Sequence, residues 1–229
     1  MSGGTVSGET VRGAAKGGRA AATRESILAA AERLFAEHGV AAVSNRQISE
    51  AAGQGNNTAV GYHFGSKDDL VRAVVRKHNG QIERLREEMV ERAEGSAELR
   101  DWVACTVLPT ARHLSGLGTP TWFGRFYAQI STDPAYRDAM AEESLGSPAL
   151  VRAVDGLNRC LPDLPLEVRV ERGDMARQVM VHMLAERERA LAVNAATPRT
   201  SWQQAATGIV DALTGLWLAP VTHPKENQR

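Results

Sequence analysis

The stretch VSNRQISEAAGQGNNTAVGYHFGSKDDL, from Val43 to Leu70, decides the fold of this chain. It predicts two short helices joined by a glycine-containing turn, followed at once by the start of a third helix. Ser44 can cap the first helix, Gln47 can complete a capping box, and Gly53 supplies the left-handed residue that ends the helix. Two helices joined by so short a turn must cross at a steep angle, which is the helix-turn-helix geometry.

The second helix of this pair is short, rich in small residues and polar at its tip. Asn56, Asn57 and Thr58 are good N-caps for it, and it is predicted to run on to Phe64. Such a helix can enter the major groove of DNA, where asparagine pairs with adenine and threonine touches the thymine methyl group. As plain caps the three residues need no DNA at all, so both interpretations stand.

Helices are also predicted on either side of this pair. Apolar residues recur on one helical face from about Thr23 to His38, and Gly39 ends that helix. Ser66 caps a long helix that has carboxylates in its first turn and that fades near residue 94. The long helix is of a length that can join a small head to a larger body.

The rest of the chain is predicted to be helical throughout, which makes the fold all-α. Proline- and glycine-containing connectors separate helices near 97–114, 119–131, 134–159, 165–195 and 201–218. The domain assignment that follows is a flexible basic N-terminal arm over 1–22, a DNA-binding domain over 23–68, a helical effector-binding and dimerisation domain over 69–220, and a flexible tail over 221–229.

The last two helices carry broad apolar faces. The residues are Met175, Val179, Met180, Met183 and Leu184 in one helix, and Ile209, Val210, Leu213, Leu216 and Trp217 in the other. Faces of this width need a partner surface, and a two-fold homodimer is the commonest solution. Core packing within one chain is the alternative.

Composition indicates a helical protein of the cytoplasm. Of the 229 residues 43% are hydrophobic, and no apolar run approaches the ~20 residues that a membrane helix needs. The first 22 residues lack the apolar core of a signal peptide, and Cys105 and Cys160 lack metal-site spacing. The net charge is zero, but residues 1–24 hold four basic residues against one acidic residue, which favours DNA binding near that end.

Arginine and aromatic side chains in the motif suit DNA for chemical reasons. Arg46 lies in the first turn of the first motif helix, where a guanidinium can fork onto guanine or grip a phosphate. The Tyr62 hydroxyl and the His63 imidazole, which follow Gly61, suit phosphate oxygens. A solvated surface arginine and a packed structural histidine are the competing interpretations.

The sequence argues against an enzyme. It contains no phosphate loop, dinucleotide fingerprint or nucleophile elbow. His78, His113 and His182 lack the partners of a zinc site, so neither a metal nor another cofactor is expected. The charged run from Glu186 to Arg189 is predicted to be a solvated helix face.

Three motifs resemble the DNA-binding domain of the tetracycline-repressor (TetR) family of bacterial transcription regulators. They are Thr23–Gly39 with its ILAAAERLFAEHG helix, Ser44–Gly53, and YHFGSKDDL from Tyr62 to Leu70. They occur in the family's order and cover about the first third of the chain, whereas the remainder is similar only in length and helical character. The turn between Gly53 and His63 is one residue longer than in many members, so the register of the second helix stays open.

The resemblance implies roles for particular residues. Ser44, Asn45 and Arg46 match the positions of a phosphate-contacting hydroxyl and a base-contacting side chain, and Lys67 matches the family's phosphate-binding lysine. With the chemical arguments above, the expected DNA-binding set is Arg24, Ser44, Asn45, Arg46, Asn56, Asn57, Thr58, Gly61, Tyr62, His63 and Lys67.

The resemblance also implies a ligand-responsive repressor that binds a palindromic operator as a homodimer through its last two long helices. A small effector, apolar or planar, is expected in the body, with the candidate lining residues Trp102, Cys105, His113, Trp122, Phe123, Phe126, Tyr127 and Met180. Arg125 is a candidate partner for an anionic group. A ligand-independent or architectural DNA-binding protein and, more remotely, an all-helical enzyme remain the alternatives.

Overall fold

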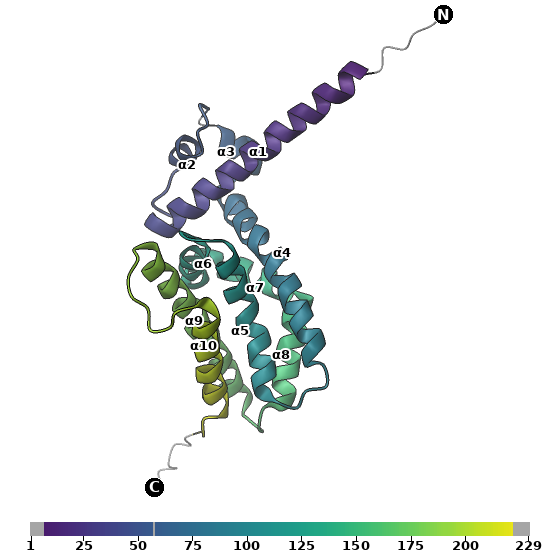
Figure 1. Cartoon of the computed structure of the whole chain (residues 1–229), viewed down its shortest axis with the longest axis vertical. Helices are drawn as coiled ribbons and strands as arrows, with labels where there is room; N and C mark the ends of the chain where they lie inside the picture. The colour runs from purple at the N-terminus through teal and green to yellow at the C-terminus, as the bar shows by residue number, and fades with distance from the viewer. Residues whose placement is uncertain (1–6, 57, 222–229) are drawn as a thin grey trace, which may run out of the picture. The chain divides into compact units, whose positions relative to one another are not determined.

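Ten helices make up the part of the chain that the computed structural model describes, residues 7–56 and 58–221 (Figure 1). Every regular element in these residues is a helix, so the predicted all-α class is confirmed. In chain order the helices are α1 (Ser7–His38), α2 (Asn45–Ala51), α3 (Ala59–Phe64), α4 (Lys67–Ala93), α5 (Leu99–Gly116), α6 (Phe123–Thr132), α7 (Pro134–Leu145), α8 (Pro148–Cys160), α9 (Leu166–Ala192) and α10 (Trp202–Leu218).

The chain divides into two compact units, Met1–Lys77 and His78–Arg229. The first unit holds α1, α2, α3 and the beginning of α4, and the second holds the remainder of α4 and the other six helices. Of the predicted tail 221–229, only Val221 belongs to the described residues.

The first unit is built on a small apolar core with a contribution from each of its helices. Phe35 of α1, Ile48 of α2, Val60 of α3 and Leu70 of α4 are all 0% exposed. Burying a side chain of this size stabilises the fold by about 1.5–3 kcal/mol relative to leaving it in water. Burial of these four side chains stabilises α2 and α3, which are too short to be stable alone.

The local capping of α2 and α4 follows the prediction. The Gln47 backbone N–H donates to Ser44 Oγ at 3.3 Å, and the Ser44 backbone N–H donates to Gln47 Oε1 at 2.8 Å, which completes the capping box. Gly53 has φ +68°, as the end of α2 requires. At α4, the Asp69 N–H donates to Ser66 Oγ at 3.0 Å, and the Ser66 hydroxyl donates to Asp69 Oδ2 at 2.6 Å.

The N-terminal segment differs from the expectation. A flexible arm was predicted over 1–22, but α1 extends back to Ser7, and residues 1–6 lie outside the described residues. Several alanines together with Arg12, Lys16 and Arg19 favour helix in this segment, whereas its glycines oppose it.

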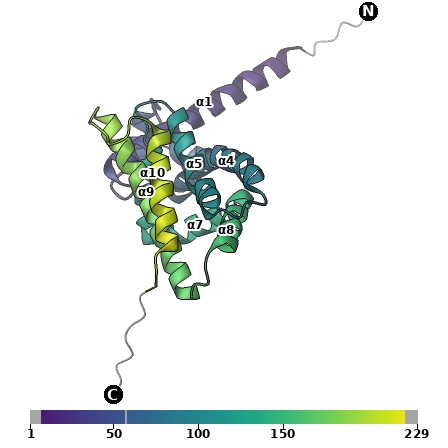
Figure 2. The same cartoon turned by 60° about the horizontal axis from the view of Figure 1, so that its bottom comes forward.

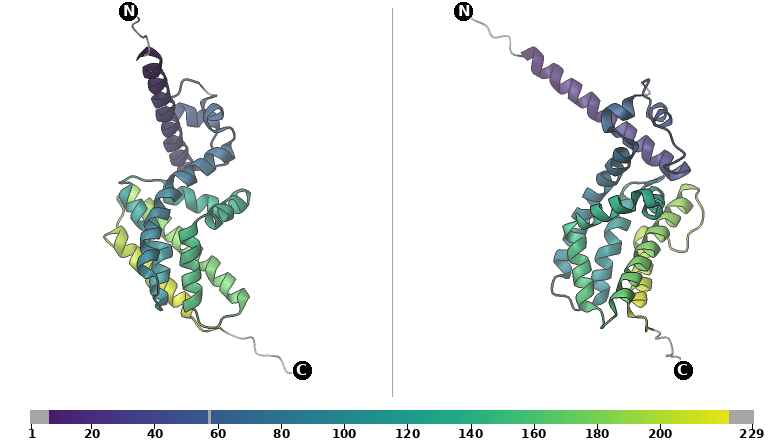
Figure 3. Two further views of the ribbon diagram at one scale, coloured as in Figure 1. Left: turned by 90° about the vertical axis from the view of Figure 1, so that its right-hand side faces the viewer. Right: turned by 180° about the vertical axis from the view of Figure 1, so that it is seen from behind.

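In the second unit α5 is the central helix. It packs against α10 on one side and α8 on the other, while α6 packs against α9 and α7. Figures 1 and 2 show α9 and α10 running side by side, and Figure 3 shows α8 beside α4 and α5. The largest fully buried side chains of this unit include Trp102, Leu114, Phe126, Ile130 and Leu184.

One predicted helix, 134–159, is two helices in the structure. α7 ends at Leu145 and α8 begins at Pro148, with Ser147 extended between them (φ −103°, ψ 95°). Proline suits the first turn of a helix and disfavours helical backbone in the residue before it. Glu83 of α4 accepts the Ala149 N–H at 2.7 Å and thereby fixes the new start.

The apolar face of α10 is mostly buried within its own chain. Ile209, Val210, Leu213 and Trp217 are at most 6% exposed, because α10 packs against α5 and α9. The prediction that this face makes the dimer contact is therefore corrected for these four residues. On α9, Met175, Val179 and Met183 are 39–56% exposed, as the prediction requires. No helix in the described ranges is both long and apolar enough to span a membrane.

Candidate DNA-binding surface and effector pocket

The turn before α3 is held by its own side chains. Asn56 Oδ1 accepts the Thr58 backbone N–H at 2.9 Å and the Thr58 hydroxyl at 2.7 Å. Thr58 occupies the N-cap position of α3 but makes no side-chain capping bond. The predicted capping by Asn56 and Thr58 is thus replaced by a bond between them, and Asn57 lies outside the described residues. Because the hydroxyl of Thr58 is already engaged, its methyl group is the part that suits a thymine contact.

The outer face of α3 is open. Ala59 and Val60 are buried beneath it, whereas Tyr62 is 85% exposed and Gly61 is exposed. A Cβ added at Gly61 would meet nothing within 4 Å, so packing does not require glycine there. His63 is half-buried, with its ring edge-on to that of Tyr62 at 5.0 Å between centroids. An unpacked tyrosine beside a bare glycine leaves room for another molecule to approach the helix backbone.

The start of α2 presents three different environments. The Ser44 hydroxyl donates to Gln47 Oε1 at 2.8 Å and is therefore already committed to the cap. Asn45 is half-buried, and its Oδ1 is buried with no hydrogen-bond partner. Arg46 is exposed and donates from Nε to Glu50 Oε1 at 2.8 Å. This bond and the Glu50 charge raise the pKa of Arg46.

Lys67 has an intramolecular role that the sequence did not indicate. Its ammonium donates to the backbone oxygen of Val43 at 2.6 Å and to that of Val40 at 3.2 Å. Both carbonyls belong to the loop between α1 and α2. An ammonium has three donors, so one is left for a phosphate. Lys67, which was expected to bind phosphate, thus also joins α4 to the loop between α1 and α2.

Arg24 and Phe64 are packed together. The Arg24 guanidinium lies over the Phe64 ring, 4.8 Å from its centroid, which is a cation–π contact. Phe64 is half-buried, and the exposed Arg24 covers part of its ring. The guanidinium is held in a fixed position on the first unit rather than on a free arm.

In the body, most of the eight predicted effector residues are packed core. Trp102 and Phe123 are 2% exposed, Cys105 is 1% exposed and Phe126 is 0% exposed. Trp102 donates from Nε1 to Ser96 O at 3.0 Å, and Trp122 is half-buried at the residue before α6. Burial raises the pKa of the Cys105 thiol to about 11. Trp102, Cys105, Phe123 and Phe126 therefore belong to the packed core of the second unit.

His113 was expected to stand alone but has a partner. Its Nε2 lies 2.7 Å from Nδ1 of His78, and both rings are buried. Phe123 stacks on His78 with 3.9 Å between centroids and an interplanar angle of 16°. Among the described residues no group of three or more His, Cys, Asp or Glu side chains is placed to hold a metal ion.

Tyr127 and Met180, like Trp122, are half-buried. They pack together against a small cluster formed by Ala128, Val181 and Ala185. They therefore lie between α6 and α9, at the margin of the core.

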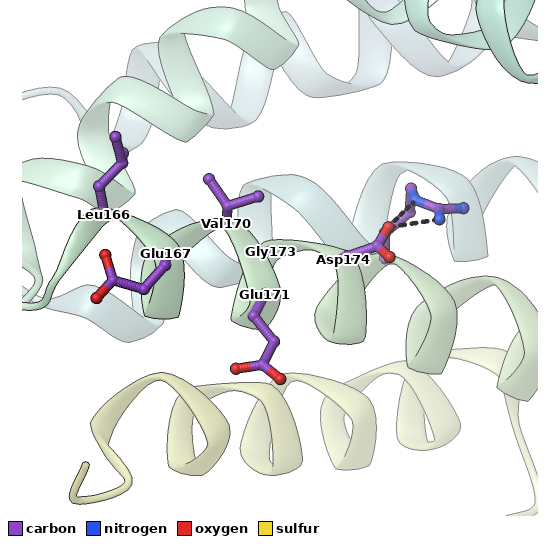
Figure 4. Close-up of a pocket in the computed structure, with 7 residues that line it drawn as sticks. Leu166, Glu167, Val170, Glu171, Gly173 and Asp174 are labelled. Atoms are coloured by element: carbon purple, nitrogen blue, oxygen red, sulfur yellow. Dashed lines mark hydrogen bonds and ion pairs between the residues drawn. The ribbon is translucent and has the colours of Figure 1, made fainter. Parts of the chain in front are cut away.

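A pocket of about 790 Å³ runs along α9 from Leu166 to Arg177. Figure 4 shows Leu166 and Val170 projecting on the same side of α9, Glu171 projecting toward α10, and the Asp174 carboxylate bonded to the Arg177 guanidinium. None of the eight predicted effector residues is among the described residues that line this pocket. It was missed because its apolar residues are few and separated by charges.

The charged run near the end of α9 was misjudged. Glu188 is 1% exposed, and it accepts the Thr121 hydroxyl at 2.5 Å, the Gly124 N–H at 3.1 Å and the Arg125 N–H at 2.9 Å. It therefore caps the N-terminus of α6. Arg125 Nε also lies 3.3 Å from a carboxylate oxygen of Glu188, so its charge is already paired within the chain.

Arg187, in the same run, is 8% exposed and donates to Arg199 O at 2.8 Å. A solvated face is thus wrong for both Arg187 and Glu188. The helical spacing of Glu188 from the buried Val181, Leu184 and Ala185 places it on the buried face, and that pattern was available in the sequence.

Comparison with known proteins agrees with the helix pair and with the helical body. The family model described as bacterial regulatory proteins of the tetR family matches residues 27–74, and the model described as the tetracyclin repressor-like C-terminal domain matches residues 104–215. The chain belongs to the TetR family.

Named TetR-family relatives carry the description "HTH-type transcriptional repressor AcnR". The protein from Corynebacterium glutamicum is 28% identical over 128 residues, which is 54% of this chain and 58% of that protein. The one from Corynebacterium efficiens is 27% identical over 168 residues, 67% of this chain and 77% of that protein. The match thus spans less than two thirds of the first relative's length.

Solved TetR-family structures share the fold. A transcription regulator from Marinobacter aquaeolei VT8 has a TM-score of 0.58 at 19% identity, covering 87% of this chain and 95% of that one. A regulator from Shewanella sp. PV-4 has a TM-score of 0.55 at 15% identity, covering 85% and 96%. At these identities the likeness supports the architecture alone.

Proposed function

We propose that this TetR-family chain is a ligand-responsive transcriptional repressor that binds a palindromic operator as a homodimer. DNA binding is assigned to residues 23–68, and effector binding and dimerisation to residues 69–220. The observation that carries the proposal is the outer face of α3, where Tyr62 is 85% exposed over a buried Val60. A large aromatic side chain left in water on a helix-turn-helix motif is best explained by a partner that covers it.

The distribution of charge supports DNA as that partner. The first unit carries ten Lys and Arg against seven Asp and Glu, whereas the second carries seventeen against twenty. The chain as a whole is neutral, so the positive excess belongs to the unit that holds the motif. A local positive excess provides the affinity for phosphates that a neutral chain otherwise lacks.

The exposed side chains of α9 and α10 support dimerisation. Met175, Val179 and Met183 recur every four residues and form an exposed apolar stripe on α9. On α10 the exposed residues Ala212 and Gly215 are small, which allows close approach of a second helix. We assign the dimer contact to these outward faces, because the larger apolar residues of α10 are buried within the chain.

Selection of bound fragments from a random DNA pool tests the function. A repressor of this kind enriches a palindromic consensus, whose two halves match the two-fold symmetry of the dimer. Enrichment without a consensus would favour an architectural DNA-binding protein, and no enrichment would refute DNA binding. An apolar or planar effector then raises the melting temperature by mass action and lowers affinity for the selected DNA.

A further inference from the structure

Arg46 and Glu50 form an ion pair on the outer face of α2, about one helical turn apart. Arg46 Nε donates to Glu50 Oε1 at 2.8 Å, and the two side chains are 72% and 54% exposed. Between them in the sequence, Ile48 and Ser49 are both 0% exposed. The pair is therefore carried by a helix whose opposite face is fixed in the core of the first unit.

The pair is oriented against the stability of α2. Arg46 lies in the first turn and Glu50 in the last turn, so α2 has no acidic residue at its start and no basic residue at its end. The helix dipole favours the reverse placement, and arginine before glutamate is also the weaker order for an i, i+4 pair. Exposed ion pairs contribute little to stability in general. Stabilisation of this short helix therefore does not account for the pair.

The bond to Glu50 engages one edge of the Arg46 guanidinium. A guanidinium has five N–H donors, of which Nε carries one, so this bond uses none of the four donors on Nη1 and Nη2. One donor from each of these two nitrogens forms a fork that matches O6 and N7 of guanine. Glu50 thus holds Arg46 by the nitrogen that this fork does not need.

The pair is also electrically neutral toward phosphates. Arg46 is the one basic residue of α2 and Glu50 the one acidic residue, so the formal charge of this helix is zero. Each phosphate that a protein neutralises releases counterions and strengthens binding to DNA of any sequence. A neutral pair adds little to that indiscriminate attraction, whereas hydrogen bonds to base edges carry the sequence information.

We propose that Glu50 is a specificity-determining residue, which positions the Arg46 guanidinium for guanine and cancels its charge toward phosphate. This inference rests on the proposed function, since it concerns how the same motif distinguishes an operator from other DNA. Glu50 acts through Arg46 and needs no contact of its own with a base. Both effects raise the ratio of operator affinity to random-DNA affinity.

Fluorescence anisotropy on the full-length protein tests the inference with two probes, the selected palindrome and a random-sequence duplex of the same length. Glu50→Gln keeps an acceptor for Arg46 Nε and removes the charge. At roughly 0.1 M salt we expect this variant to bind the random duplex about fivefold more tightly, with a salt slope steeper by about one unit. The palindrome gains less, so the ratio of the two affinities falls.

Glu37→Gln is the matched control, because Glu37 also pairs with an arginine four residues earlier, Arg33, within the same unit. It should leave the affinity ratio unchanged. In an Arg46→Ala background, Glu50→Gln should likewise leave the ratio unchanged, since the guanidinium that it positions is gone. Melting temperatures check that the exposed substitutions leave the fold intact.

An unchanged ratio in Glu50→Gln, an equal fall in Glu37→Gln, or a fall that persists without Arg46 would overturn the inference. A general loss of charge would produce the second of these results. The outcome of the DNA selection separates the two proposals. A consensus whose preference over random DNA is insensitive to Glu50 refutes only this inference, whereas a selection without a consensus refutes the proposed function and this inference with it.

Discussion

The ammonium of Lys67 donates to the backbone oxygen of Val43 across 2.6 Å, which ties the first turn of α4 to the loop before α2. Lys67→Ala leaves the Val43 and Val40 carbonyls without this donor. We expect a loss of about 1–3 kcal/mol in the free energy of unfolding, measured by urea denaturation. An unchanged denaturation midpoint would show that water replaces the ammonium at no cost.

Arg46 and Arg33 offer a matched pair for DNA binding. Each is ion-paired to a glutamate four residues later, the exposed Arg46 with Glu50 on α2 and the half-buried Arg33 with Glu37 on α1. Arg46→Ala is expected to weaken binding of the selected DNA about tenfold or more, whereas Arg33→Ala leaves it unchanged. Fluorescence anisotropy measures both, with melting temperatures as the folding control. Equal losses in the two variants would indicate a general charge effect.

Tyr62 is predicted to contact phosphate through its hydroxyl. Because the side chain is 85% exposed, Tyr62→Phe and Tyr62→Ala should change the free energy of unfolding by less than about 0.5 kcal/mol. Both should weaken DNA binding, and if the hydroxyl is the contact Tyr62→Phe accounts for most of the loss. Full affinity in both variants would remove the outer face of α3 from the interface.

Val179 and Val151 separate the proposed dimer contact from general surface hydrophobicity. Both valines are 39% exposed, on α9 and α8 respectively. Val179→Glu places a charge in the proposed interface and is expected to give monomers in sedimentation velocity at micromolar concentration. Val151→Glu is expected to remain dimeric. Dimers from both variants would place the contact elsewhere.

Gly156 and Gly80 test the packing of the body. A Cβ at Gly156 would lie 2.1 Å from the Trp102 ring, so Gly156→Ala should cost about 1–3 kcal/mol of stability by overpacking. Gly80 lies exposed within α4 with nothing within 4 Å of its added Cβ. Gly80→Ala should instead stabilise the protein by roughly 0.5–1 kcal/mol, because alanine favours helix. Thermal denaturation of the two variants gives the sign directly.

The features that the sequence predicted correctly depend on residues close together in the chain. The capping box of Ser44 and Gln47 and the left-handed Gly53 depend on residues within one turn of each other, and the structure has them as predicted. The break at Pro148 was equally local and was overlooked, although proline disfavours helical backbone in the residue before it.

What escaped prediction depends on residues far apart in the chain. Lys67 meets a carbonyl 24 residues away, and Glu188 meets α6 more than 60 residues away. Propensity and periodicity say nothing of such pairings until the helices are packed. Of the aromatic residues expected around a ligand, Trp102, Phe123 and Phe126 are buried in the packed second unit, and their contact with an effector stays a prediction. The DNA contacts assigned to α2 and α3 stay predictions, because they require a partner molecule.

Glu188 and the first turn of α6 illustrate how strictly two segments can be bound to a shared register. The Glu188 carboxylate of α9 accepts two backbone N–H groups at the start of α6, so one helix supplies the N-terminal cap of another. Each residue of an α-helix turns its side chain by about 100°. One residue inserted between Leu184 and Glu188 would therefore rotate the carboxylate away from α6. The backbone N–H groups of Gly124 and Arg125 would then lose their acceptor. We therefore expect an insertion in this part of α9 to destabilise the protein more than an insertion in a connector.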